Sequence, residues 1–466
     1  MMDYLDVKRD DINYMHLYGD ATKLMENAAR QLSDFVRKTF VPGSRICAVC
    51  GTGNNAGDGI AALENLRGDY DVSAVLVKGK GSLKTDEAKW AIKRYKGRVS
   101  GIRSLKQELA GSDIILDCMF GVGISGEPRE PYAKAIEQIN KSGKKIVSID
   151  VPSGLGTKRS VMPDYTVTFT DVKKGMAPEN SGDITVCDIG IPESVRKYAG
   201  PGDMVYYTRP DPSSHKGMNG SLSIIGGWEY YGSSVIAALG ANAMAIDLVK
   251  IYTTPLNYEI IATYSPFIIV RNIAKLGNNW KEDALRGTAL LIGPGLGISD
   301  EAQKDVKQML GKAKMPIIVD ADGIKLMSDK ISWTRGRNMI FTPHRREFEI
   351  LTGLDANEEN AVKFAEKHSV VIVLKGVRDI VTDGSRTIYV EGGNVRMTMG
   401  GTGDLLAGLI SAMASRNIDP FRSAVMGAYI NKKIAERAFS SKSYWYSIDD
   451  MIDAVPGFMK ESANWA

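Results

Sequence analysis

Cysteine is scarce in this sequence: the chain has four in 466 residues, Cys47, Cys50, Cys118 and Cys187. So few scattered thiols exclude a disulfide framework and favour a reducing compartment. Cys47 and Cys50 form a CxxC pair, but they lie in an apolar run, residues 45–50, that is predicted to be a strand. Because strand residues three apart point to opposite faces, we expect packing cysteines there rather than a redox pair or a zinc site.

The chain also lacks a charge excess and a long apolar run. Its 59 basic and 55 acidic residues leave a net charge of +4, which does not favour nucleic acid as a partner. Residues 1–16 contain no apolar core of a signal peptide, and no stretch approaches the roughly eighteen apolar residues of a membrane span. We therefore expect a cytoplasmic protein without membrane association, and the length predicts two or three domains.

What the sequence does contain is a regular alternation of short apolar runs and helical patterns, typical of βα units and mostly parallel sheets. A segment rich in Pro, Gly and Ser at residues 199–220 interrupts this alternation and is interpreted as a linker, with the boundary near Tyr207. The expected organisation is therefore two α/β domains, residues 1–207 and 208–466. The predicted strands are 45–50, 72–77, 114–118, 145–149, 166–170, 184–188, 222–225, 249–252, 289–292, 316–319, 339–342, 371–374 and a hairpin of 379–382 with 387–390.

A glycine-rich loop, Gly51-Thr-Gly-Asn-Asn-Ala-Gly-Asp-Gly59, follows the first predicted strand, and a helix is expected from near Ile60. Glycines allow a tight turn and the close approach of a ligand, and a helix N-terminus favours anions. Such a loop alone is weak evidence, since it also fits a simple turn in which Asp58 caps the helix. Asn54, Asn55 and Asp58 nevertheless add polar groups that a plain turn does not need.

Two further predicted strand ends carry polar residues. Asp117 leads into Cys118-Met-Phe-Gly-Val-Gly-Ile-Ser-Gly-Glu127, and Asp150 leads into Val-Pro-Ser-Gly154. Because the carboxyl ends of adjacent parallel strands converge on one crevice, we expect all three segments to share a site. The oxygen atoms of Asn55, Asp117 and Ser153 would suit a hard cation there.

The order of GTGNNAGDG, the FGVGISG segment and DVPSG resembles the N-terminal domain of NAD(P)H-hydrate epimerases, as does the upstream Met25-Glu-Asn-Ala28. The resemblance implies a potassium ion on Asn55, Asp117 and Ser153, and Asp150 as the acid/base group for ring opening and closing at the hydrated carbon. One departure is Ala56, where the family usually has Gly, so that a negative φ is expected at this position. The residues implied to contact the hydrated cofactor are Asn54, Asn55, Ala56, Gly57, Asp58, Gly121, Val122, Gly123, Ile124, Ser125, Gly126, Glu127 and Asp150.

The second part has its own glycine-rich and polar motifs. The last of them, Met399-Gly-Gly-Thr-Gly-Asp404, is the most informative. Gly400, Gly401 and Gly403 at a helix start can present bare N–H groups to a phosphate, and Asp404 beside such a cradle is suited to act as a general base. The alternative is that Asp404 merely caps a helix over residues 405–415.

HKGxNG, GPGLG, DADG, TPHxxE, LKG and GGTGD in this order resemble the ribokinase-like superfamily and, more narrowly, the ADP- or ATP-dependent NAD(P)H-hydrate dehydratases. The resemblance implies that Asp404 helps the hydrate hydroxyl to attack a nucleotide phosphoryl group, after which phosphate is eliminated. It places the hydrate near Gly297, His344 and Asp404, and it implies Mg²⁺, although no dedicated Mg²⁺ cage is visible. The residues implied to bind ADP are Lys375, Gly376, Val377, Arg378, Asp379, Asn394, Val395, Arg396, Met397, Thr398, Met399, Gly400, Gly401, Thr402 and Gly403.

Three further features of the second part bear on its site. His215 and Lys216, within HKGxNG, are either functional or solvated surface. A lone histidine such as His344 is usually structural, but this one follows a proline at a predicted ligand edge. The segment Tyr231-Gly-Ser-Ser234 departs from the Gly-Ala-Pro that the family more often has there.

We therefore expect a Rossmann-like three-layer α/β/α domain in residues 1–207 and a ribokinase-like α/β domain in residues 208–466. The resemblance implies a bifunctional enzyme that interconverts the R and S forms of hydrated NADH or NADPH and dehydrates the S form while ADP becomes AMP and phosphate. It also implies a homo-oligomer. Two alternatives stay open: a small-molecule (vitamin) kinase in the second domain, and a non-catalytic nucleotide-binding or assembly module in the first.

Overall fold

The computed structural model describes residues 1–123, 126–328 and 330–463. The chain divides into two compact units, Met1–Val195 and Arg196–Ala466. No helix in the described part of the chain is long and apolar enough to cross a membrane. Each unit is described by itself below.

The two compact units are divided after Val195, before the segment that the sequence marks as a linker, whereas the sequence predicts the domain division after residue 207. The first part of that segment, up to Tyr207, is packed within the second unit. It forms a 3-10 helix, Pro201–Tyr206, in which Met204 is fully buried in the core of the second unit. Tyr207 donates a hydrogen bond from its hydroxyl to the Met244 carbonyl (2.8 Å). Apolar side chains among the prolines and glycines therefore make this segment part of the fold.

The first unit is built on a parallel sheet, seven-stranded in its described residues, with the order β3-β2-β1-β4-β5-β6-β7. Its strands are β1 (Arg45–Cys50), β2 (Asp71–Leu76), β3 (Arg98–Gly101), β4 (Ile114–Cys118), β5 (Lys145–Ile149), β6 (Tyr165–Phe169) and β7 (Asp183–Cys187). Its helices are α1 (Tyr4–Tyr18), α2 (Thr22–Thr39), α3 (Asn54–Leu66), α4 (Asp86–Arg94), α5 (Leu105–Gly111), α6 (Tyr132–Asn140), α7 (Pro178–Ser181) and α8 (Glu193–Lys197), the last spanning the boundary.

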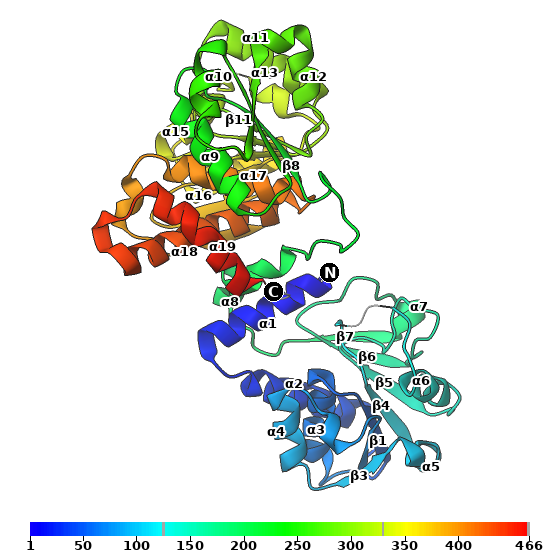
Figure 1. Ribbon diagram of the computed structural model, residues 1–466. Helices are drawn as coiled ribbons and strands as arrows, with labels where there is room; N and C mark the ends of the chain where they lie inside the picture. Colours follow the sequence, from blue (N-terminus) through cyan, green and yellow to red (C-terminus); the bar gives the residue numbers. More distant parts are fainter. Residues whose placement is uncertain (124–125, 329, 464–466) are drawn as a thin grey trace. The chain divides into compact units, whose positions relative to one another are not determined.

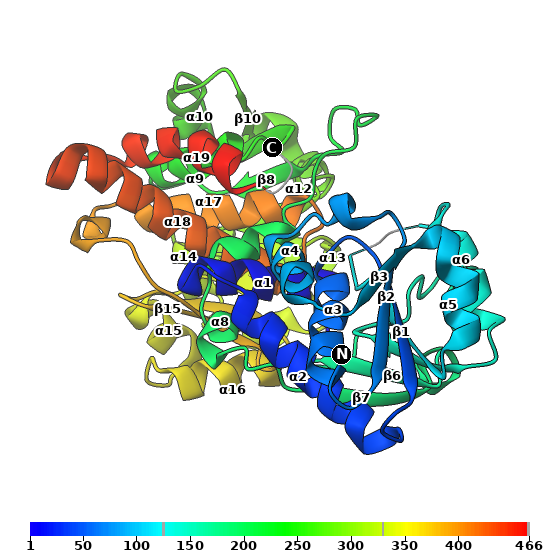
Figure 2. The same cartoon turned by 90° about the horizontal axis from the view of Figure 1, so that it is seen from below.

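Helices cover both faces of this sheet, with α2, α3 and α4 on one face and α5 and α6 on the other (Figures 1 and 2). Cys50 packs with the first group and Cys47 with the second, so the prediction of two buried thiols on opposite faces is confirmed. The sequence pattern missed β3 because this edge strand is only partly buried and shows no apolar run.

The second unit is built on a sheet that is nine-stranded in its described residues, with the order β10-β9-β8-β11-β12-β13-β14-β15-β16. β15 pairs antiparallel with both β14 and β16, and the other neighbouring strands pair parallel. The strands are β8 (Ser221–Ile225), β9 (Leu248–Thr253), β10 (Ile268–Asn272), β11 (Ala289–Ile292), β12 (Ile317–Val319), β13 (Met339–Phe341), β14 (Val371–Leu374), β15 (Asp379–Thr382) and β16 (Thr387–Val390).

The helices of the second unit form two layers around its sheet (Figure 1). One layer contains α9, α17, α18 and α19, and the other contains α12 to α16. The bounds are α9 (Tyr231–Ala243), α10 (Pro255–Ala262), α11 (Ile273–Leu276), α12 (Trp280–Ala284), α13 (Asp300–Lys312), α14 (Ala321–Leu326), α15 (Arg345–Thr352), α16 (Glu358–His368), α17 (Thr402–Ser415), α18 (Pro420–Lys442) and α19 (Ile448–Ser462).

Both sheets reverse their strand order beside their first strand, at β1/β4 and at β8/β11. In open parallel sheets this reversal opens a crevice in which ligands bind. Glycines let the loops meet closely there: a Cβ on Gly51 would lie 1.9 Å from the Met119 carbonyl oxygen, and one on Gly226 would lie 2.3 Å from that of Pro294. The topology therefore provides one crevice in each unit.

Candidate active sites

The crevice of the first unit contains a cavity of about 900 Å³. Residues predicted from the sequence that line it are Asn54, Asn55, Asp58, Gly121, Val122, Gly123 and Asp150. Ala56 and Gly57 are instead buried within α3, and the Glu127 carboxylate accepts a hydrogen bond from the Lys158 backbone N–H (3.0 Å). The predicted residues Ile124 and Ser125 lie outside the described residues.

The helix after the glycine-rich loop begins earlier than the sequence predicts. It starts at Asn54 with Gly53 as its N-cap, rather than near Ile60, so Asp58 lies inside α3 and does not cap it. Glycine is unfavourable inside a helix, so Gly57 and Gly59 make this turn of the helix look like a loop in the sequence. A Cβ on Gly57 would lie 2.4 Å from the Met25 side chain, which explains the glycine by tight helix packing.

An ion pair lies at the cavity wall behind Asp150. The Asp150 carboxylate is 2.6 Å from Lys173 Nζ, and these side chains are only 13% and 4% exposed. Lys173 also donates to Thr168 Oγ1 (2.9 Å). Asp150 has a left-handed φ of 63°, which is uncommon for a residue with a side chain and is typical of functional sites. The sequence did not single out Lys173, because nothing local marks a lysine in the loop after β6 as the partner of Asp150.

Other carboxyl groups face the same cavity. Burial, followed by the neighbouring Asp150 and Asp10, raises the pKa of Asp11 to about 7. Burial, followed by Asp150 and Asp11, also raises the pKa of Asp58 well above its usual range. Glu87 lines the cavity as well. The site therefore brings carboxyl groups that can carry a proton near pH 7 close to a carboxylate paired with lysine.

The three predicted cation ligands are joined in one hydrogen-bond network. Asp117 is fully buried at the end of β4 and accepts hydrogen bonds from Ser153 Oγ (2.6 Å), the Ser153 N–H (2.8 Å) and Ser148 Oγ (2.9 Å). Ser153 Oγ also accepts from the Phe120 N–H (3.0 Å), and Asn55 Nδ2 donates to the Phe120 carbonyl (3.0 Å). The network connects all three strand ends around the crevice.

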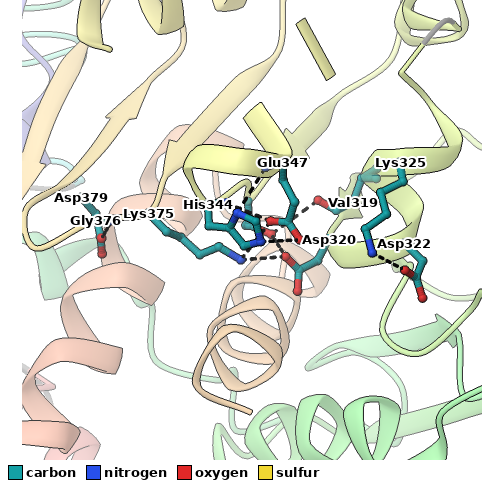
Figure 3. Close-up of polar contacts among 10 residues, drawn as sticks. Val319, Asp320, Asp322, Lys325, His344, Glu347, Lys375, Gly376 and Asp379 are labelled. Atoms are coloured by element: carbon teal, nitrogen blue, oxygen red, sulfur yellow. Dashed lines mark hydrogen bonds and ion pairs between the residues drawn. The ribbon is translucent and has the colours of Figure 1, made fainter. Parts of the chain in front are cut away.

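The site of the second unit centres on Lys375, directly after β14 (Figure 3). Its Nζ lies 3.1 Å from Asp320 Oδ1 and 3.7 Å from Glu347 Oε2. Thr342 Oγ1 also donates to Asp320 Oδ1 (2.7 Å). Burial opposes the charge on Lys375, but Asp320 and Glu347 outweigh it and raise the pKa of the lysine. The lysine is therefore held charged inside the unit by two carboxylates.

The start of α17 lies next to Lys375. Gly401 is its N-cap with a φ of 94°, and no side chain caps the helix, so its first N–H groups remain available to an anion. A Cβ on Gly403 would lie 3.3 Å from Lys375 Nζ. Asp404 lies in the first turn and is not the cap, so the capping alternative is wrong. Burial, and then Asp320, raise the pKa of Asp404 to about 7, while Ser233 and Lys375 oppose this.

His344 has a structural role that the sequence predicted only as an alternative. It is the N-cap of α15, where its Nδ1 accepts from the Glu347 N–H (3.2 Å) and its own N–H donates to Glu347 Oε2 (2.9 Å). Its side chain is still 54% exposed, so the ring is accessible (Figure 3). Gly297 has a φ of 78° and donates its N–H to Asp322 Oδ2 (2.9 Å). His215 and Lys216 are exposed.

The loop between β14 and β15 is held in place by a lysine that the sequence did not indicate. Lys432 of α18 donates from Nζ to the carbonyls of Gly376 and Val377, both at 2.9 Å. It also lies 3.4 Å from Asp379 Oδ1, which accepts the Gly376 N–H (2.8 Å). The Arg378 guanidinium lies over the Tyr389 ring, 4.5 Å from its centre. This loop is thus ordered by buried polar contacts.

The segment before α17 is anchored in a similar way. Asn394 caps a 3-10 helix, Val395–Thr398, by accepting from the Arg396 N–H (3.1 Å). The Tyr446 hydroxyl donates to Asn394 Oδ1 (2.9 Å), and Asn394 Nδ2 donates to the Ala435 carbonyl (3.0 Å). Met399 and Gly400 follow, and Thr402 Oγ1 donates to the Met397 carbonyl (2.9 Å). The predicted ADP-binding residues therefore form two anchored segments, one after β14 and one before α17.

Two open-sheet α/β units, each with charged and glycine-rich groups at its strand-order reversal, define a two-domain α/β enzyme. Comparison with known proteins gives the same division. The family described as YjeF-related protein N-terminus matches residues 21–175, and the family described as NAD(P)H-hydrate dehydratase matches residues 222–457. A solved ribokinase-like superfamily protein from Enterococcus faecalis resembles the chain with a TM-score of 0.53 and 25% identity, covering 57% of this chain and 96% of that one.

Relatives that match almost the whole chain include two archaeal repair enzymes. The bifunctional NAD(P)H-hydrate repair enzyme Nnr of Hyperthermus butylicus is 33% identical over 97% of this chain and 91% of its own length. The enzyme of the same description from Archaeoglobus fulgidus is 35% identical over 93% of both chains. The chain belongs to the family of bifunctional NAD(P)H-hydrate repair enzymes, with an epimerase domain followed by a dehydratase domain. The predicted fold class and family are confirmed.

Proposed function

We propose that the first unit interconverts the R and S epimers of hydrated NADH or NADPH, and that the second unit dehydrates the S epimer at the expense of ADP. The observation that carries the second half of this proposal is the position of Asp404 in the first turn of α17, beside the partly buried Lys375. The first half rests on the cavity that holds Asp150 together with other carboxyl groups.

In the second unit, Asp404 takes the proton of the hydrate hydroxyl as its oxygen attacks the β-phosphoryl group of ADP, and AMP leaves. Phosphate then departs with the oxygen while the neighbouring ring carbon loses a proton, which restores the double bond of the nicotinamide. Lys375 and the free N–H groups of α17 stabilise the charge on the transferred phosphoryl group. The nucleotide would lie along the segments 375–379 and 394–403, with the hydrate near Gly297 and His344.

A magnesium ion would reach this site with the nucleotide. Within the part of the chain that the structure describes, no three His, Cys, Asp or Glu side chains gather into a metal site. Mg²⁺ commonly binds one or two carboxylates plus substrate phosphates, and Asp320, Glu347 and Asp404 offer such carboxylates. When bound, Mg²⁺ would neutralise phosphate charge.

In the first unit, the donor chemistry fits a potassium ion. The Asn55 amide, the Ser153 hydroxyl, the Phe120 carbonyl and the Asp117 carboxylate offer oxygen donors with a single charge, which suits a hard monovalent cation. Asp117 already accepts several hydrogen bonds, and these reduce the negative charge that its carboxylate can offer to a divalent ion. The cation would add positive charge beside the anionic substrate, while Asp150 performs the proton transfer.

The experiment uses separated R and S hydrates of NADH with purified protein and ADP, and follows the return of the absorbance of reduced nicotinamide. We expect the S hydrate to recover in the wild type and in an Asp150→Asn variant, but not in Asp404→Asn. With the R hydrate, the absorbance should return faster than spontaneous epimerisation allows in the wild type, but not in either variant. Failure of the S hydrate to recover with wild-type protein would exclude the dehydratase proposal.

The match of residues 222–457 to the dehydratase family argues against the vitamin-kinase alternative, and incubation of a panel of alcohols with ATP tests it directly. A cytoplasmic location is proposed as well, since the cysteines of the described residues are buried free thiols that fit a reducing compartment. Self-association stays a prediction, and sedimentation of the purified chain tests it.

A further inference from the structure

Part of the lining of the cavity in the first unit comes from residues that precede the segment matched by the epimerase-type family. That match begins at residue 21, whereas α1 spans Tyr4–Tyr18 and contributes Val7, Asp11 and Met15 to the cavity lining. A helix from outside the matched segment therefore completes the pocket that holds Asp150.

The position of α1 is fixed by backbone pairing next to the ion pair of Asp150. The Met2 N–H donates to the Val172 carbonyl and the Lys174 N–H donates to the Met2 carbonyl, both at 2.9 Å. Residues 172 and 174 flank Lys173, the partner of Asp150. At its other end, α1 packs through Tyr14 against Leu24. The helix is thus held at both ends, and its cavity face is set relative to Asp150.

Asp11 is the carboxyl group that this helix presents to the cavity. Asp11 is exposed to the cavity that it lines, and the surrounding protein still partly desolvates its carboxyl group. The charged groups that act on it come from several elements: Asp10 on α1, Glu87 on α4, Asp150 after β5 and Lys173 after β6. Three of these four are acids, so a proton on Asp11 is favoured.

We propose that Asp11 is the proton donor that complements Asp150 in the epimerisation, an inference that rests on the function proposed for the first unit. The Asp150 carboxylate takes the proton of the hydrate hydroxyl, the bond between the hydrated carbon and the ring nitrogen breaks, and the carbon becomes an aldehyde. The ring nitrogen keeps the electron pair of the broken bond and receives the proton of Asp11. Rotation of the aldehyde and reversal of both transfers closes the ring with the opposite configuration.

The neighbouring Asp58 is less suited to this role. A group that must give and retake a proton in each turnover works best with a pKa near the working pH. Burial and the nearby acids raise the pKa of Asp11 to about 7, which meets this condition. Asp58 is less accessible than Asp11, since it is partly covered within α3.

The test compares Asp11→Asn, Asp11→Glu and the control Asp86→Asn in the full-length protein. Asp86 is a carboxyl on α4 that is 92% exposed and does not line the cavity. Exchange between the R and S hydrates of NADH is followed by NMR without ADP, from about pH 5 to pH 9. Dehydration of the S hydrate by the second unit, with ADP, and the thermal unfolding curve report whether each variant is folded.

We expect Asp11→Asn to slow exchange by about 10²–10⁴-fold with S-hydrate dehydration unchanged. In the wild type and in Asp86→Asn the exchange rate should fall as the pH rises through about 7, because the donor loses its proton, and this fall should be absent from the residual rate of Asp11→Asn. Asp11→Glu should recover part of the rate and the alkaline fall.

Two results would overturn the inference. The first is an Asp11→Asn protein that exchanges the epimers at the wild-type rate with its alkaline fall intact. The second is loss of that fall in Asp58→Asn but not in Asp11→Asn, which would assign the proton to Asp58. A wild-type chain that does not accelerate exchange at all would instead overturn the epimerase function on which the inference rests.

Discussion

Replacing Lys375 by methionine tests the electrostatic account of the second site. The change removes the partly buried cation that lies 3.1 Å from Asp320 and 3.7 Å from Glu347, whose side chains are buried, at 3% and 8% exposed. Breaking a buried ion pair by deleting one partner costs about 3–5 kcal/mol, because it leaves an uncompensated charge. Asp320 keeps its hydrogen bond from Thr342, so we expect a loss near the lower end, about 3 kcal/mol.

The same substitution should also change the pKa of Asp404. Lys375 lowers the pKa of Asp404, which is already raised to about 7, so its removal should raise this pKa further. A carboxyl whose folded-state pKa lies above its unfolded value destabilises the fold when it is ionised, and this cost is lost as the pH falls below the folded-state pKa. The stability loss of Lys375→Met should therefore be larger at pH 8 than at pH 6.

The assay is urea unfolding at both pH values, together with the pH profile of S-hydrate dehydration. Because we propose Asp404 as a base, we expect the wild-type rate to rise with pH through about 7. In Lys375→Met, the remaining rate should show this rise at a higher pH. The control is Lys325→Met, which removes a half-exposed lysine 2.8 Å from Asp322 and should cost less than about 1 kcal/mol. Equal losses at both pH values with an unmoved pH profile would refute the reasoning.

Three further substitutions follow from the geometry. Asp404→Asn should lower the rate of S-hydrate dehydration by about 10²–10⁴-fold and leave epimer exchange unchanged, as kinetics on the separated hydrates would show. Gly51→Ala places a Cβ 1.9 Å from the Met119 carbonyl oxygen and should destabilise the first unit by about 3 kcal/mol while dehydration is retained, which calorimetry with an activity assay would detect. Ala56→Gly should cost about 1 kcal/mol in urea unfolding without loss of exchange, because Ala56 is a buried helical residue.

The strands were predictable because buried parallel strands form apolar runs that turn signals interrupt. The predicted strands agree with the structure to within one residue, and the hairpin of β15 with β16 has the predicted bounds. The edge strand β3 was missed because it is only partly buried and its sequence has no distinct apolar run. The edge strand β10 was missed although Ile268-Ile-Val270 forms a short apolar run.

The sites were predictable only where local sequence motifs mark them. GTGNNAGDG and GGTGD identified both loops, but the start of α3 at Asn54 was hidden by its glycines. Lys173 and Lys432 were not found, since their importance comes from partners distant in the chain. A lysine carries no sequence signal for such a contact, and only the packed structure brings the charges together.

Lys432 also bears on how the second unit would bind the nucleotide that we propose to lie along residues 375–379. The loop it holds has its carbonyls and its Asp379 carboxylate engaged before any ligand arrives. A loop that is already ordered loses little conformational entropy on binding, so less of the interaction energy is used in ordering it. The association rate is then not limited by folding of the loop. Since this lysine lies in α18, partial opening of that helix would release the loop and weaken nucleotide affinity before the unit as a whole unfolds.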